Sequence, residues 1–197
     1  MSDAPAEPPS GARSTILTWR APDASRMESV RIQLSGSRIK AAGQIVAAAT
    51  ATHPAFNAYY DLQTDDTGAA KRIGLRVTLA ERERQLSIAR DEENMWLVSS
   101  SQGESRASFD GALDVDLVLS PFFNALPIRR LGVRDQGDTV SVPVIYLTLP
   151  SMEINPATIS YRSAGDGIAV SSPVAEAILT VDDDGFIVAY PGLAERI

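Results

Sequence analysis

Apolar and polar side chains alternate along much of the 197-residue chain, at the two-residue spacing that is typical of β-strands. In residues 72–79 every second position is apolar, and in residues 113–119 apolar residues alternate with Asp114 and Asp116. Each segment therefore predicts a strand with one buried and one solvated face. Weaker versions of the pattern predict strands at residues 29–34, 38–47, 56–62, 84–89, 95–99, 140–149, 158–162, 167–171, 177–182 and 186–190.

Short turn sequences separate these segments. The run Asp183-Asp184-Gly185 lies between two strand patterns and is typical of a tight hairpin, and residues 35–37, 135–138 and 165–167 have similar compositions. Many short strands with turns at nearly regular spacing predict a mostly β fold, with one antiparallel sheet that is closed or half-closed.

One segment predicts a short helix instead. Ser120 and Pro121 have the residue types that begin helices, Pro127 limits the helix length, and Gly132 suits its end. The alanine-rich residues 41–51 also allow a helix, although their glycine and the continuing alternation favour a strand.

Composition and charge narrow the class of protein. The net charge of −7 disfavours binding to nucleic acid or to an anionic membrane surface, because basic residues are interleaved with acids. No apolar run reaches the ~18 residues of a transmembrane helix. The first residues are acidic and proline-rich, which predicts a disordered leader at residues 1–14 and a cytoplasmic location. The length of the chain predicts a single domain at residues 15–197.

Several kinds of catalytic or metal site lack their residues. The chain has no cysteine, a single histidine (His53), no nucleophile-elbow motif and no phosphate-binding glycine loop, so the sequence indicates no metal or cofactor. Asp114 and Asp116 share a strand face and would suit a hydrolase of glycosides or esters. We favour a structural latch instead, in which these carboxylates pair with Arg129 and Arg130.

Residues 113–117 (LDVDL) and 120–131 (SPFFNALPIRRL) resemble the D-V-D-L … [ST]-P-F-x-N-x-L-P-I-R-R-L core of the bacterial family named for putative glycolipid binding. Asn94-Met95 replaces the glycine that usually precedes the tryptophan of the family, and no glutamine precedes Tyr161. Further landmarks in the same order are Trp19, Glu28, residues 42–43, residues 59–61, Trp96, residues 144–150, residues 161–162, residues 181–187, residues 190–193 and Arg196.

The resemblance implies a fold like that of the lipoprotein carriers of the Lol system: an incompletely closed antiparallel half-barrel that wraps a short helical segment and encloses an apolar cavity. It also implies non-enzymatic binding of an amphipathic molecule such as a glycolipid. We expect Phe122 and Phe123 to meet the acyl part of the ligand, and Asn124, Arg129 or Arg130 to meet its head group.

Other interpretations of the same motif stay open. The helix could be a structural plug that fills the half-barrel, the protein could be a hydrolase using Asp114 and Asp116, or an exposed sheet edge could bind another protein. The sequence does not indicate an oligomeric state.

Overall fold

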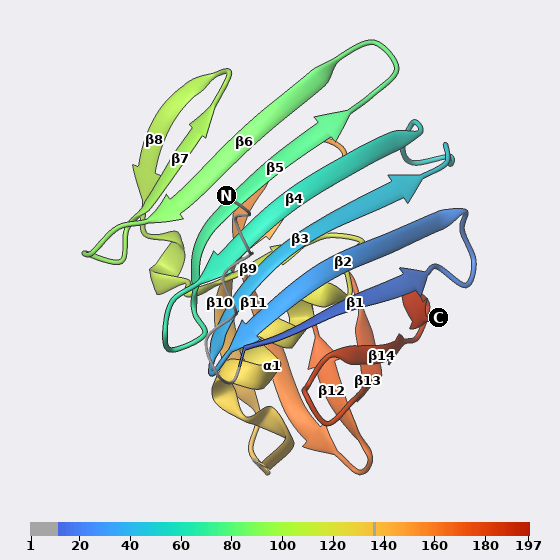
Figure 1. Ribbon diagram of the computed structural model, residues 1–197, viewed down its shortest axis with the longest axis vertical. Helices are drawn as coiled ribbons and strands as arrows, with labels where there is room; N and C mark the ends of the chain where they lie inside the picture. The colour runs from blue at the N-terminus through green and yellow to red at the C-terminus, as the bar shows by residue number, and fades with distance from the viewer. Residues whose placement is uncertain (1–11, 136) are drawn as a thin grey trace, which may run out of the picture.

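The computed structural model describes residues 12–135 and 137–197, which form one curved sheet with a short helical segment packed between its two arms (Figure 1). Within these residues, fifteen strands join in the order β8-β7-β6-β5-β4-β3-β2-β1-β15-β14-β13-β12-β11-β10-β9. The strands of the first arm are β1 (Arg13–Arg20), β2 (Arg26–Ser35), β3 (Arg38–Ala47), β4 (Phe56–Thr64), β5 (Ala70–Thr78), β6 (Glu83–Arg90), β7 (Trp96–Ser100) and β8 (Gly103–Ala107). Those of the second arm are β9 (Asp114–Leu117), β10 (Val140–Leu147), β11 (Ile154–Ala164), β12 (Gly167–Ser171), β13 (Glu176–Val181), β14 (Ile187–Tyr190) and β15 (Ala194–Arg196).

The sheet is a half-barrel, as the sequence predicts. Strands β8 and β9 form its two edges, and within the described residues each has a strand neighbour on one side only. Every pair is antiparallel except β9 and β10, which run parallel. Parallel neighbours need a long crossover connection, and here the crossover contains the 3-10 helices η2 (Phe122–Asn124) and η3 (Val133–Asp135) and the helix α1 (Ala125–Leu131). The crossover therefore explains why a helix lies between the arms.

The alternation predicted from the sequence determines which side chains enter the core. In β2, Val30, Ile32 and Leu34 are buried, whereas the residues between them face solvent. Strand β3 continues this pattern and pairs with β2 and β4 along its length, so the alanine-rich segment is a strand at residues 38–47 and not a helix.

The crossover begins differently from the sequence-based prediction. Ser120 is not the capping residue, since Pro121 directly precedes η2 and no side chain caps this helix; the Ser120 hydroxyl donates a hydrogen bond to Glu28. Pro127 lies in the first turn of α1, where backbone amides have no partner within the helix, so its missing N–H costs little. Gly132 ends α1 with a φ of 59°, as its residue type indicates.

The crossover segment lies between two apolar cores. Phe122 and Phe123 of η2 pack into the larger core, which lies against β2–β7 and contains Trp96 of β7. Ile128 of α1 packs into the smaller core against β10–β14, where Tyr161 is buried. The helical segment thus joins the two arms through apolar contacts on both sides.

Strands β1, β8 and β15 are absent from the sequence-based prediction. The side chains of β8 are almost all exposed, so this strand has no apolar alternation to detect. The predicted leader falls for the most part on residues 1–11, which lie outside the described residues, but Arg13 and Ser14 already belong to β1 and pair with β2. The turn predicted at residues 135–138 includes residue 136, which is likewise outside them.

Candidate functional site

The short strand β9 carries two carboxyl groups on one face. Asp114 and Asp116 are two residues apart and lie opposite Val144 and Tyr146 of β10. Because successive strand residues point to opposite faces, Val115 and Leu117 enter the larger core while both aspartates face the helical segment. The two carboxyl groups nevertheless have different surroundings.

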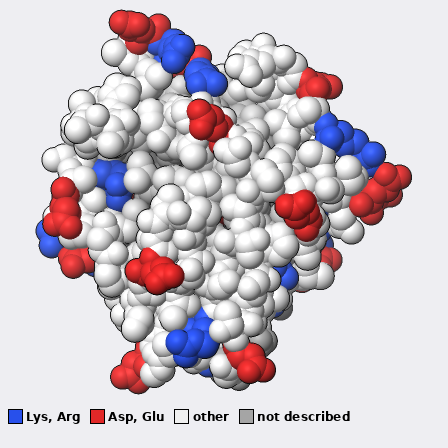
Figure 2. Space-filling view, turned by 180° about the vertical axis from the view of Figure 1, so that it is seen from behind, with Lys and Arg blue, Asp and Glu red and all other residues white. Residues whose placement is uncertain are grey.

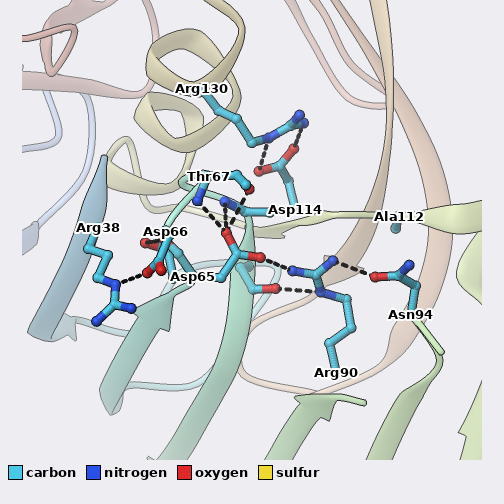
Figure 3. Close-up of polar contacts among 12 residues, drawn as sticks. Arg38, Asp65, Asp66, Thr67, Arg90, Asn94, Ala112, Asp114 and Arg130 are labelled. Atoms are coloured by element: carbon cyan, nitrogen blue, oxygen red, sulfur yellow. Dashed lines mark hydrogen bonds and ion pairs between the residues drawn. The ribbon is translucent and has the colours of Figure 1, made fainter. Parts of the chain in front are cut away.

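Two ion pairs lie close together at Asp114 (Figure 3). The carboxylate of Asp114 is fully buried and forms an ion pair with Arg130 of α1 at 2.5 Å. Burial raises the pKa of Asp114, and the hydrogen bond and charge of Arg130 oppose this shift. Nearby, Arg90 pairs with Asp65 at 2.5 Å and donates to the Ala70 carbonyl at 3.0 Å. The Asp114–Arg130 pair links β9 to α1, and the Arg90–Asp65 pair links β6 to the β4–β5 turn; we call the Asp114–Arg130 pair the latch.

Asp116 instead lines a pocket of about 280 Å³. Apolar side chains form much of its wall, and Val174 at its margin is 72% exposed. Leu119, which follows β9, has a φ of 76°, a conformation that leucine rarely adopts, in the turn that the Ser120 N–H closes on the Leu117 carbonyl. The described residues that line the pocket are Asp116, Leu117, Val118, Leu119, Ser120, Asn124, Tyr146, Ser172, Val174, Ala175, Tyr190, Pro191, Gly192 and Leu193.

The carboxylate of Asp116 has no compensating partner. Within residues 12–135 and 137–197, no hydrogen bond or ion pair reaches it, and none of the pocket residues is basic. Burial alone raises the pKa of Asp116 to about 7. Burial and the charge of Asp116 together raise the pKa of Tyr146 to about 12 and also raise those of Tyr161 and Tyr190. The carboxyl group therefore lies among neutral phenols.

A second buried carboxyl group lies behind the wall of the pocket at Ser120. Oε1 of Glu28 accepts hydrogen bonds from Ser120 at 2.5 Å and from Tyr60 at 2.6 Å, while its Oε2 has no partner among the described residues. Burial raises the pKa of Glu28 to about 7, although both hydrogen bonds oppose the shift. Gly43 makes room for this arrangement, since a Cβ there would lie 2.3 Å from the Tyr60 ring.

The residues singled out in the sequence lie in four places. Asn124 lines the pocket and accepts a hydrogen bond from Tyr161 at 3.1 Å. Phe122 and Phe123 are buried in the larger core and line neither the pocket at Asp116 nor the hollow beside β6–β8. Their packing fits the plug interpretation, and their contact with a ligand stays a prediction.

Arg129 and Arg130 also contact different parts of the molecule. Arg130 belongs to the latch with Asp114, whereas Arg129 donates to the carbonyl of Asp184 and lies 4.8 Å from the centre of the Phe186 ring. The predicted carboxylate–arginine pair thus forms at Asp114 and not at Asp116. Neither arginine lines the pocket at Asp116.

Most of the other pocket residues were not singled out in the sequence, among them Tyr146, Val174, Tyr190 and Leu193. A signal for part of the set was present, because residues 190–193 and the strand that contains Tyr146 belong to the motifs described above. For Val174, in the loop between β12 and β13, the sequence holds no comparable signal.

A larger hollow of about 740 Å³ lies between β6–β8 and the turn before β11. Exposed polar residues form most of its wall, and Arg84 there donates to the Ser151 carbonyl at 2.7 Å. We place the candidate site at Asp116 because the smaller pocket combines apolar walls with an unpaired carboxyl group, which is the usual composition of a ligand site.

Comparison with known proteins agrees with the resemblance noted in the sequence. The model of the family described as "Putative glycolipid-binding" matches residues 16–196. The chain belongs to this family. A solved structure of a DUF1089 family protein from Pseudomonas aeruginosa has the same fold, with a TM-score of 0.71, 24% sequence identity, and coverage of 91% of this chain and 95% of that chain. The comparison with curated proteins gives no match.

For this family member, the described residues show two further features. None of their helices is long and apolar enough to cross a membrane, and none of their acidic side chains gather with each other or with His53 in a group that could hold a metal ion. On the face opposite that of Figure 1, acidic and basic side chains are scattered and no continuous basic patch is visible (Figure 2). The cytoplasmic location stays a prediction from the sequence.

Proposed function

We propose that the protein binds an amphipathic, lipid-like molecule, such as a glycolipid, in the pocket at Asp116, and that it does so without a catalytic step. The observation that carries this proposal is the unpaired carboxyl group in a pocket with an apolar margin. Such a pocket offers a polar contact at one end and apolar contacts at the other, which matches the two parts of an amphipathic ligand.

The size of the pocket indicates how much of the ligand enters it. Its volume of about 280 Å³ is close to the lower end of the ~300–1,000 Å³ that is typical of small-molecule sites. The pocket therefore holds one end of a lipid, and the remaining chain would lie across the exposed side chain of Val174. An apolar side chain that is exposed at the margin of a pocket is suited to this contact.

The latch supports binding over hydrolysis. A hydrolase that uses Asp114 and Asp116 needs both carboxyl groups to face one substrate. Asp114 is instead fully buried and paired with Arg130, so it cannot approach a substrate in the pocket without breaking the latch.

Native mass spectrometry tests the proposal. We expect protein purified gently from a bacterial host, or incubated with a total lipid extract, to carry a discrete added mass that organic solvent extracts as a lipid. The variant Ala175→Trp places a large ring at the pocket wall and should remove the added mass. Val46→Trp, on an exposed outer position of β3, is the matched control and should retain it.

Two results would contradict the proposal. The first is a clean mass without ligand after incubation with the extract. The second is an added mass that Ala175→Trp leaves unchanged, because the ligand would then be bound elsewhere.

A further inference from the structure

The pocket at Asp116 holds an acidic group without a matching base. In most of the chain the buried or partly buried acids have a cationic partner: Asp114 has Arg130, Asp65 has Arg90, and Asp182 has Arg196 at 2.6 Å. Asp116 lies two residues from Asp114 on the same strand face and has no such partner within the described residues. Glu28, buried behind Ser120, also lacks an ion pair but accepts hydrogen bonds from Ser120 and Tyr60, whereas Asp116 has neither kind of partner among the described residues.

An uncompensated carboxylate is costly in a partly desolvated site, and a bound cation removes the cost. The neighbouring groups suit a cation as well. Tyr146 and Tyr190 line the pocket together with Asp116, and aromatic rings of this kind attract ammonium groups. An anionic head group would instead meet the Asp116 carboxylate with no base in the lining to offset the repulsion.

We propose that the polar end of the ligand carries a positively charged amine, which pairs with the carboxylate of Asp116 beside Tyr146 and Tyr190. This inference rests on the proposed binding function and specifies the head group. It predicts an amphiphile with an ammonium group, in contrast to one with a phosphate, a carboxylate or an uncharged sugar alone.

Three probes with the same octyl chain separate the head groups: octylammonium, octyl glucoside and octanoate. We expect isothermal titration calorimetry of the full chain at about pH 8 to show that octylammonium binds at least about tenfold more tightly than the other two. Asp116→Asn should abolish this preference and leave the binding of octyl glucoside unchanged. Asp166→Asn, in the exposed turn between β11 and β12, is the matched control and should bind like the parent protein.

The preference should also depend on pH, because only the ionised form of Asp116 attracts the amine. Since burial raises the pKa of Asp116 to about 7, affinity for octylammonium should rise about tenfold or more between about pH 5.5 and about pH 8.5, while the alkylammonium group stays charged. Tyr146, Tyr161 and Tyr190 stay neutral in this range because their pKa values are raised.

Other charged groups near the pocket need a control. Glu28 touches Ser120 from behind and its pKa is also raised to about 7, whereas Asp114 on the same strand face is paired with Arg130. Glu28→Gln should therefore keep the pH dependence of octylammonium binding, and Asp116→Asn should lose it. Loss of the pH dependence in Glu28→Gln alone would assign the titration to Glu28 and overturn the inference.

The remaining outcomes separate the inference about the amine from the proposed binding function on which it rests. Equal or tighter binding of octyl glucoside or octanoate, with no effect of Asp116→Asn, overturns the amine but leaves an amphiphile site in place. Failure of all three probes to bind the parent protein counts against both. Octylammonium binding that Asp116→Asn reduces and Ala175→Trp abolishes supports both.

Discussion

Asp114 and Asp116 lie two residues apart on one face of β9, yet one belongs to the latch and the other to the pocket. The carboxylate of Asp114 is fully buried and paired with Arg130, whereas that of Asp116 borders the pocket and has no partner in the described chain. Removing the partner of a buried charge strongly destabilises a fold, whereas an unpaired carboxyl group at a pocket is available to a ligand. The comparison therefore separates a structural half of the family's central motif from a functional one.

Breaking the latch should have the largest effect. Arg130→Ala leaves the buried Asp114 carboxylate without its cation, so we expect the free energy of unfolding to fall by about 3–5 kcal/mol in urea denaturation. Adding Asp114→Ala to this variant should recover part of the loss, because the uncompensated charge is then gone. Arg134→Ala, which removes an exposed contact with Asp183, is the control, and a loss in Arg130→Ala no greater than in this control would disprove the latch.

Removing the charge of Asp116 should instead raise the free energy of unfolding. The pKa of Asp116 is about 7 in the folded chain and near ~3.9 in the unfolded chain, so the folded state binds the proton more tightly and loses stability as pH rises from ~4 to ~7. Asp116→Asn should therefore be more stable than the parent by about 2 kcal/mol at pH 8, with the gain fading towards pH 4. A variant that is less stable at pH 8 would show that Asp116 has a structural partner.

The smallest effect should come from the hydrogen bond that orients Asn124 at the pocket wall. Tyr161→Phe removes the donor to the Asn124 side chain in a buried setting, and the expected cost is about 1 kcal/mol in thermal or urea unfolding. Tyr59→Phe, on an exposed position of β4, should change stability very little. Equal effects of the two variants would mean that the Tyr161–Asn124 contact does not stabilise the wall.

Much of the fold could be predicted from the sequence, because a strand with one buried face shows it in its own residues. The alternation identified β5 and the segment around β9, and the motif predicted both the helical segment and the pairing of an aspartate with Arg130. Strand β8 escaped prediction because it buries almost none of its side chains. The parallel pairing of β9 with β10 was not predicted either, since it depends on the path of the crossover and not on either strand alone.

The pocket could be predicted only in part. Asn124 was singled out, but Tyr146 meets Asp116 through the pairing of β9 with β10, and Val174 and Tyr190 come from two other parts of the chain that only the fold of the second arm brings to the pocket. The different roles of Asp114 and Asp116 could not be predicted from the sequence either. Both fit the same local pattern, and only the position of Arg130 on α1 distinguishes them.

The most direct test of the central claim is a crystal structure of the protein with the octyl probe that binds most tightly. The account predicts that the probe lies in the pocket between β9, β10 and residues 190–193, with its head group at Asp116 and its chain towards Val174. A probe bound in the polar hollow beside β6–β8, with the pocket at Asp116 unchanged, would contradict the account.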